Sequence, residues 1–223
     1  MPIRKQVLAT GQFYHIFNKT LSNLAIFDKK SIVKRTLQLV NFTRFKPDIS
    51  YSRFKSLSEE TKKVKSELIF SAPTIVSIHS LSLMPNHFHF LLCQLVDNGI
   101  SKFLADWQNG VAKYYNIKYQ HEGKLFKESF QAVRIETTEQ LLHVSRYIHL
   151  NHITAYLMDM GGLDTSPLTS FAHYMGNINY DFIDTDLILG HFGSADKYKK
   201  FVTNQIDYQR QLKKIRHLIL DGR

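Results

Sequence analysis

Two histidines, His87 and His89, stand two residues apart in a segment that has the pattern of a buried strand. Successive side chains of a strand point to opposite faces, so both imidazoles lie on one face and Phe88 lies on the other. Two neutral imidazoles on one face provide half of a metal site. Pro85 and Asn86 directly before them predict a turn, which places the pair at the beginning of a strand with an open end nearby.

A second set of polar side chains lies on a predicted helix further along the chain. Residues 137–140, Thr-Thr-Glu-Gln, have the Thr-x-x-Gln pattern of a capping box, which predicts a helix start here. His143, Tyr147 and Asn151 follow at spacings of four residues and therefore lie along one flank of this helix. A tyrosine hydroxyl can act as a nucleophile once a metal or a base activates it, since its ordinary pKa is about 10. The amide oxygen of an asparagine can be a metal ligand.

Phosphodiester cleavage would use all of these groups. The reaction needs a nucleophile, positive charge beside the nonbridging oxygens and a stabilised leaving group. Because Mg²⁺ prefers oxygen ligands, a site with two histidines indicates that Mn²⁺ would serve as well. The spacing alone leaves other metal enzymes open, since cupin-type proteins also use such a pair.

The composition favours an anionic partner. The 223 residues include 29 Lys and Arg against 19 Asp and Glu, a formal net charge of +10, and nucleic acid is the commonest partner of such a chain. The single cysteine, Cys93, excludes an internal disulfide and a thiolate metal cluster and fits a reducing cytoplasm. No apolar run approaches the ~20 residues of a membrane span, and residues 1–5 lack the apolar core of a signal peptide. We therefore expect a cytoplasmic protein.

Hydrophobic periodicity predicts the elements that carry these groups. His15 shares a face with Phe13 and Phe17 in the first strand, and we interpret it as a packed residue, not a ligand. Strands are expected over residues 12–18, 74–83, 87–92 and 125–136, and helices over residues 28–46, 53–68, 99–121, from 138 onward, within 181–192 and after Ser194.

Five segments together resemble the IS200/IS605-like Y1 transposases, and more closely the branch associated with repetitive extragenic palindromes. Residues 83–92, Leu-Met-Pro-Asn-His-Phe-His-Phe-Leu-Leu, resemble the HUH motif, in which a bulky hydrophobic residue separates two histidines. Residues 14–16 resemble the first-strand signature, and residues 123–126 resemble the glycine-led start of a strand. Residues 146–151, Arg-Tyr-Ile-His-Leu-Asn, resemble the nucleophile helix, and residues 187–202 resemble the tail common in that branch.

The resemblance implies an α+β fold of the HUH endonuclease type. In this fold a ferredoxin-like antiparallel sheet has helices packed on one face, and here a C-terminal helical extension follows. The implied division is a catalytic domain over residues 1–160 and an extension over residues 161–223, packed on the same domain.

The resemblance also implies cleavage of single-stranded DNA beside a DNA hairpin, through a transient 5′-phosphotyrosine and with a divalent metal, Mg²⁺ or Mn²⁺. Carried over residue by residue, Tyr147 is the attacking tyrosine, and His87, His89 and Asn151 are the metal ligands. Many relatives have glutamine at the position of Asn151.

Three features depart from the pattern of that branch. His152 stands where proline usually follows the asparagine, residues 128–131 replace a usually basic stretch, and residues 53–68 look like an insertion. None of these departures removes a reacting group.

The expected partner is single-stranded DNA with a hairpin, and no membrane partner is expected. The sequence leaves open whether the active unit is one chain or a homodimer. In such a homodimer each tyrosine could meet the partner's histidines. Two other functions stay open: a DNA-hairpin-binding regulator without cleavage activity, and a metallohydrolase of small substrates. The basic side chains that we expect to contact DNA are Lys102, Lys113, Lys118, Lys124, Arg134, Lys213, Lys214 and Arg216.

Overall fold

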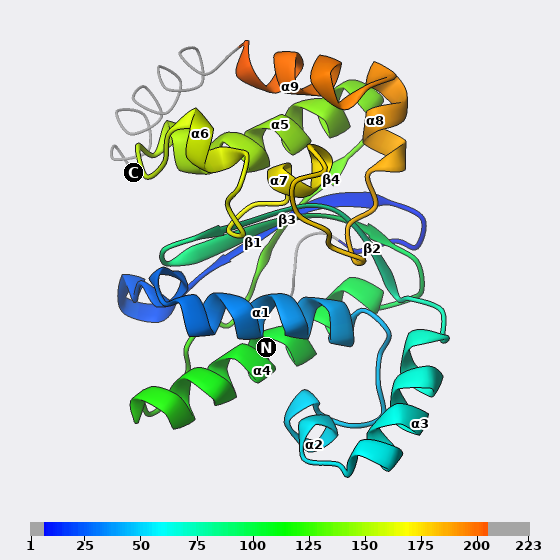
Figure 1. Ribbon diagram of the computed structural model, residues 1–223, viewed down its shortest axis with the longest axis vertical. Coiled ribbons are helices and arrows are strands. Elements are labelled where there is room, and N and C mark those ends of the chain that lie inside the picture. The colour runs from blue at the N-terminus through cyan, green and yellow to red at the C-terminus, as the bar shows by residue number, and fades with distance from the viewer. Residues whose placement is uncertain (1–6, 205–223) are drawn as a thin grey trace.

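The computed structural model describes residues 7–204, and a four-stranded antiparallel sheet lies at its centre (Figure 1). The strand order is β2-β3-β1-β4, and every neighbouring pair is antiparallel. The strands are β1 (Phe13–Lys19), β2 (Val76–Met84), β3 (His87–Gln94) and β4 (Gln131–Ile135). The predicted α+β class with a ferredoxin-like sheet is confirmed.

Helices and short helical turns connect and cover these strands. They are η1 (Leu21–Asn23), η2 (Ile26–Asp28), α1 (Lys30–Thr43), α2 (Tyr51–Lys55), α3 (Glu59–Phe70), α4 (Gly99–Tyr119), α5 (Thr138–Thr154), α6 (Met160–Leu163), α7 (Phe171–Tyr174), α8 (Asp186–Phe192) and α9 (Ala195–Thr203).

One face of the sheet packs against α1 and α4. Phe88 and Phe90 of β3 point to this side, and their ring centroids lie 4.5 and 5.2 Å from the ring of Trp107 in edge contacts. The indole nitrogen of Trp107 donates to the carbonyl oxygen of Thr36 at 3.2 Å and so joins the two helices. The side of β3 that carries Phe88 therefore belongs to this apolar layer, as the alternation of side chains predicts.

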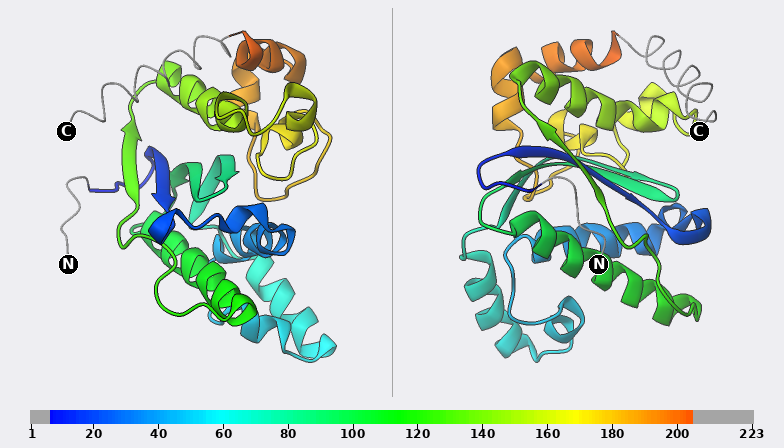
Figure 2. Two further views of the ribbon diagram at one scale, coloured as in Figure 1. Left: turned by 90° about the vertical axis from the view of Figure 1, so that its left-hand side faces the viewer. Right: turned by 180° about the vertical axis from the view of Figure 1, so that it is seen from behind.

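The opposite face is covered as well, by α5 and by the C-terminal helices (Figure 2). The expectation of helices on one face therefore describes α1 and α4 but not the whole sheet. The physical reason is that β2 and β3 are buried at every position except Ser77 and His87, which requires cover on both sides. The helix that carries Tyr147, α5, thus covers the histidine face of β3.

Two predicted elements differ from the structure in extent. The helix expected over residues 53–68 is split into α2 and α3, because the hydroxyl of Ser58 accepts from the backbone N–H of Thr61 and starts a new helix. Val64 and Leu68 of its expected apolar stripe are 54% and 63% exposed, so this stripe is not a core face. The strand expected over residues 125–136 pairs continuously only in β4.

The expected caps are present where the sequence places them. The side chain of Thr137 accepts from the N–H of Gln140 at the start of α5, and Ser194 accepts from Lys197 at the start of α9. Residues 161–204 pack on the same side of the sheet as α5, while the division at residue 160 stays a prediction. In the described part of the chain, no helix combines the length and apolar character needed to cross a membrane.

Gly99 makes a close approach that a larger residue could not make. A Cβ at this first position of α4 would lie 2.3 Å from the backbone oxygen of Ile75, whereas a Cβ on Gly190 would meet nothing within 4 Å. We expect Gly99→Ala to destabilise the protein by about 1–3 kcal/mol through overpacking. The control Gly190→Ala should be neutral or slightly stabilising. Urea unfolding measures both variants, and equal midpoints would contradict the expectation.

Candidate active site

The sheet register brings two histidines from neighbouring strands to one place. β1 and β3 pair with Phe17 opposite His89 and His15 opposite Leu91, so His15 and His89 are diagonal neighbours on the same face. Their nitrogens, His15 Nε2 and His89 Nδ1, lie 2.9 Å apart in a hydrogen bond, and the rings are stacked with centroids 5.2 Å apart. The imidazole of His87 lies beside them, 5.1 Å from that of His89.

Helix α5 places Tyr147 against this pair. The tyrosine ring lies edge-on to both His15 and His89, with a centroid distance of 5.7 Å in each case. The side chain is half-buried. All of these contacts occur within one chain, so the structure brings Tyr147, His87 and His89 together without a second copy.

The hydrogen bonds of the two β3 histidines bear on which nitrogen could hold a cation. His87 Nδ1 lies 2.7 Å from Asn86 Oδ1, which can only accept, so this nitrogen carries the proton. His89 Nδ1 can likewise donate to His15 Nε2. In that tautomer the lone pair of both rings is on Nε2, the arrangement usual for metal-binding histidines whose other nitrogen is oriented by a neighbour. Burial lowers the pKa of His15 to about 4, so His15 is neutral near pH 7 and able to accept.

Asn151 follows Tyr147 by one helical turn, which is about 6 Å along the axis of α5. It is 2% exposed, and its Nδ2 atom is buried without a hydrogen-bond partner among the described residues. A buried amide of this kind is unfavourable unless something bonds to it. As an N–H donor, this atom could bond to an anionic oxygen such as that of a phosphate, whereas a metal would need the amide oxygen Oδ1.

Metal-ligand chemistry limits what this site could bind. Within residues 7–204, no cluster of three or more His, Cys, Asp or Glu side chains is arranged to hold a metal. The predicted ligands are the imidazole nitrogens of His87 and His89 and the amide oxygen of Asn151. That donor set fits Mn²⁺ and tolerates Mg²⁺ with water completing its shell. The arrangement is suited to a phenol that attacks a phosphate held beside a cation.

The third residue of the predicted flank, His143, is turned away from the site. Its Nδ1 atom lies 2.6 Å from Arg146 Nη2, and its Nε2 atom lies 3.8 Å from a carboxylate oxygen of Glu139. His143 is exposed. Of the three residues with this spacing, Tyr147 faces the histidines and Asn151 is buried one turn further on.

The basic residues expected on α4 lie across the sheet from the histidine face. Lys102 pairs with Asp106 at 3.0 Å, and Lys102 and Lys113 line a cavity of about 520 Å³ between α1, α2 and α4. The ammonium group of Lys118 lies 5.7 Å from the ring centroid of Tyr114. The sheet therefore separates these three lysines from Tyr147.

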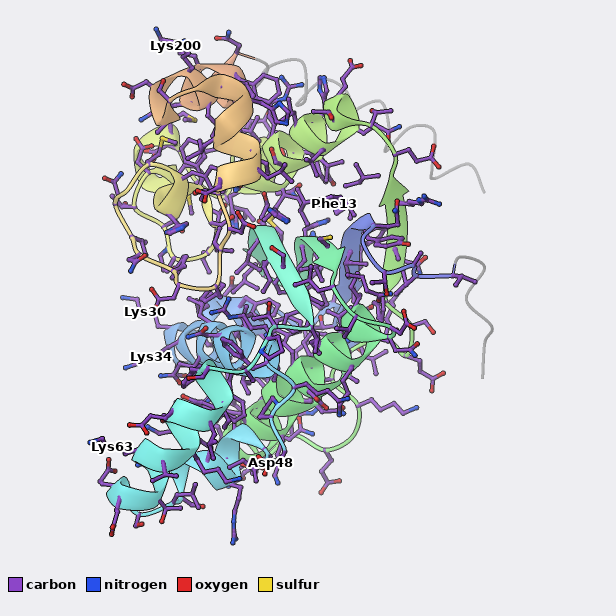
Figure 3. All side chains as sticks on the ribbon, turned by 90° about the vertical axis from the view of Figure 1, so that its right-hand side faces the viewer. Phe13, Lys30, Lys34, Asp48, Lys63 and Lys200 are labelled. Carbon is purple, nitrogen blue, oxygen red and sulfur yellow. The ribbon has the colours of Figure 1, made fainter. Side chains whose placement is uncertain are left out.

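The other expected DNA contacts are scattered. Lys124 forms an ion pair with Glu128, and Arg134 on the edge strand β4 donates to Gln12 Oε1 at 2.8 Å. Lys213, Lys214 and Arg216 lie outside the described residues. Further lysines on α1 and α3, among them Lys30, Lys34 and Lys63, point outward into solvent (Figure 3).

His15 is the residue of this site that sequence reasoning missed. We interpreted it as a packed residue because Phe13 and Phe17 share its face, and it does lie 5.2 Å from the ring of Phe17. Its role beside His89 depends on the pairing of β1 with β3, which no local pattern states. The available signal was the histidine in the first-strand signature, together with the position of β1 next to the third strand in a ferredoxin-like sheet.

Comparisons with known proteins give a family model and a solved structure that this chain resembles. The family model described as "Transposase IS200 like" matches residues 48–151, a range that includes His87, His89, Tyr147 and Asn151. None of the curated proteins matches the chain. A solved structure described as a REP-associated tyrosine transposase bound to a REP hairpin matches with a TM-score of 0.51 and 13% identity, covering 83% of this chain and 93% of that one. This likeness shows a shared fold, and the resemblance to Y1 transposases is confirmed.

Proposed function

Because residues 48–151 match the IS200-like transposases, we propose that this protein is an endonuclease and strand transferase for single-stranded DNA. It acts beside DNA hairpins, with a divalent metal and through a 5′-phosphotyrosine. The observation that supports the proposal best is the position of the Tyr147 ring, 5.7 Å from both His15 and His89. The proposed nucleophile and the proposed ligand His89 therefore have rings in contact within one chain.

In the reaction, the Tyr147 oxygen attacks the phosphorus of one phosphodiester. A bond forms between that oxygen and phosphorus, and the bond from phosphorus to the 3′ oxygen breaks. The phenol releases its proton to solvent, and the 3′ oxygen takes a proton from solvent and leaves as a hydroxyl. The phosphate stays on Tyr147 with its 5′ nucleotide. Attack by another 3′-hydroxyl reverses these steps and joins the strand elsewhere.

His87, His89 and Asn151 would hold the divalent metal. When bound, Mg²⁺ or Mn²⁺ supplies positive charge beside the nonbridging oxygens and the attacking phenolate. His15 orients His89 through its hydrogen bond, and α5 carries both Tyr147 and Asn151 to the same face of the sheet.

The proposed substrate is a single strand that folds into a hairpin. The net charge of +10 favours an anionic partner, and the solved relative is bound to a REP hairpin. For this chain we propose the same class of DNA. The contacts made by basic side chains should weaken with salt, and each lost phosphate contact should lower the slope of that dependence by about one unit.

A denaturing gel tests the proposal directly. The protein is incubated with a panel of single-stranded hairpin oligonucleotides and Mn²⁺, and the expected result is a band in which protein and DNA stay joined after denaturation. The same mixture with a chelator should give no such band. If the protein binds Mn²⁺ and hairpins but no adduct forms with any oligonucleotide, the protein is a hairpin-binding regulator instead.

His15 gives a prediction on metal affinity. We expect His15→Phe to weaken Mn²⁺ binding about tenfold, because the variant keeps an aromatic ring but removes the acceptor of the His89 hydrogen bond. Isothermal titration calorimetry measures this affinity. His121→Phe is the matched control, since His121 bonds to Asn116 at the far end of α4. Equal affinities in the two variants would contradict a role for His15.

A further inference from the structure

The residues on either side of Tyr147 in α5 contact the C-terminal helices. His149, two residues after Tyr147, is fully buried. Its Nδ1 atom lies 2.8 Å from the hydroxyl of Tyr198 in α9, and its Nε2 atom lies 2.8 Å from Ser170 Oγ. Ser170 Oγ in turn accepts from the backbone N–H of Leu81 in β2 at 2.9 Å. His149 thus connects α5, α9 and the sheet.

Tyr198 also reaches the residue on the other side of the nucleophile. Its hydroxyl lies 3.0 Å from Ser145 Oγ, so one phenol bonds to α5 both before and after Tyr147. The guanidinium of Arg146 lies 4.3 Å from the ring centroid of Phe201 and donates to the Phe201 carbonyl oxygen at 3.4 Å. Of the four residues nearest to Tyr147 in the chain, three therefore form hydrogen bonds with α9 or with the loop before α7. They are Ser145, Arg146 and His149.

These hydrogen bonds lie in a buried and closely packed region. Tyr198 is fully buried, and its ring lies 4.9 Å from that of Tyr174, which lies 4.9 Å from His149. Both ring nitrogens of the buried His149 lie within hydrogen-bond distance of a hydroxyl oxygen. Moving α5 off the sheet would leave several buried polar groups without partners, which is costly.

We infer that His149 and Tyr198 are positioning residues that hold Tyr147 against the histidines of its own chain. Through these contacts the C-terminal helices lock α5 in place on the sheet. The role of these residues in positioning Tyr147 for attack rests on the proposed function. The fixing of α5 on the sheet does not, because it follows from the contacts of Tyr198 alone.

Hydrogen exchange tests the lock without reference to activity. Tyr198→Phe removes the hydroxyl and keeps the ring, and the backbone amides of α5 should then exchange about tenfold faster or more. Tyr180→Phe is the matched control, because the Tyr180 hydroxyl lies in the same C-terminal segment but donates to Pro167. Unchanged exchange in α5 of Tyr198→Phe would overturn the lock. If this variant fails to fold, Ser145→Ala takes its place, since it removes one of the two partners of the hydroxyl.

Kinetics separate positioning from general stability. At saturating hairpin DNA and Mn²⁺, Tyr198→Phe should form the covalent adduct about tenfold more slowly, while its affinities for both stay unchanged. A residue that only stabilises the fold would leave the rate of the folded fraction as it is in the wild type. Tyr180→Phe should match the wild type in rate and in both affinities.

If the wild type itself forms no adduct, the proposed function fails, and hydrogen exchange still decides on the lock.

Discussion

Replacing Tyr147 by phenylalanine is expected to lower covalent adduct formation by at least about a thousandfold, to a level undetectable on a denaturing gel. The variant keeps the ring that lies 5.7 Å from His15 and from His89, so the packing of α5 should not change. Only the oxygen that would bond to phosphorus is missing. Hairpin DNA and Mn²⁺ should bind to this variant as they do to the wild type.

A matched tyrosine variant shows whether the effect belongs to Tyr147. Tyr119 lies at the end of α4, across the sheet from the histidines, and is 37% exposed. Tyr119→Phe should therefore form adduct at the wild-type rate. Retained adduct formation by Tyr147→Phe, with the fold intact by circular dichroism, would remove this residue from the reaction and leave the small-substrate metallohydrolase or another nucleophile to consider.

The second large effect is expected for His89→Ala. This change removes one proposed ligand and also the partner of His15 at 2.9 Å. Mn²⁺ affinity should fall by about a hundredfold or more, since loss of an outer-shell partner alone typically costs ten- to a hundredfold. Adduct formation should fall with it and recover only in part at high Mn²⁺. Calorimetry and the gel assay measure the two effects on the same preparation.

The control for this experiment is His191→Ala, because His191 is an exposed residue of α8. It should leave both Mn²⁺ affinity and adduct formation unchanged. A result in which His89→Ala binds Mn²⁺ like the control would show that the metal, if one is used, is held elsewhere. The His15 hydrogen bond would then serve packing alone.

Local patterns in the sequence were sufficient for much of this site. Strict alternation placed His87 and His89 on one strand face, and the Thr137 capping box located the helix that carries Tyr147. Both signals act over a few residues, and each has a direct physical cause in side-chain direction or in unsatisfied N–H groups. The same holds for Ser194 at the start of α9.

Contacts between distant segments were not predictable in the same way. His15 meets His89 only because β1 inserts between β3 and β4, and the periodicity of residues 12–18 does not encode that order. The bond between Tyr198 and His149 joins residues 49 positions apart, with no motif connecting them. The prediction of one helix over residues 53–68 was wrong because a single serine cap outweighed an apolar repeat. Contacts between distant segments determine the first two features, the His15–His89 contact and the Tyr198–His149 bond. A local cap determines the third, the division of the helix over residues 53–68.

Mass spectrometry of the covalent complex is the most direct measurement of the proposed chemistry. The wild-type protein is incubated with a hairpin oligonucleotide and Mn²⁺, the adduct is digested with protease and nuclease, and the modified peptide is sequenced. We expect a nucleotide linked through its 5′ phosphate to the side chain of Tyr147, with a free 3′-hydroxyl on the released fragment. A nucleotide on any other residue, or strand cleavage without a covalent complex, would contradict it.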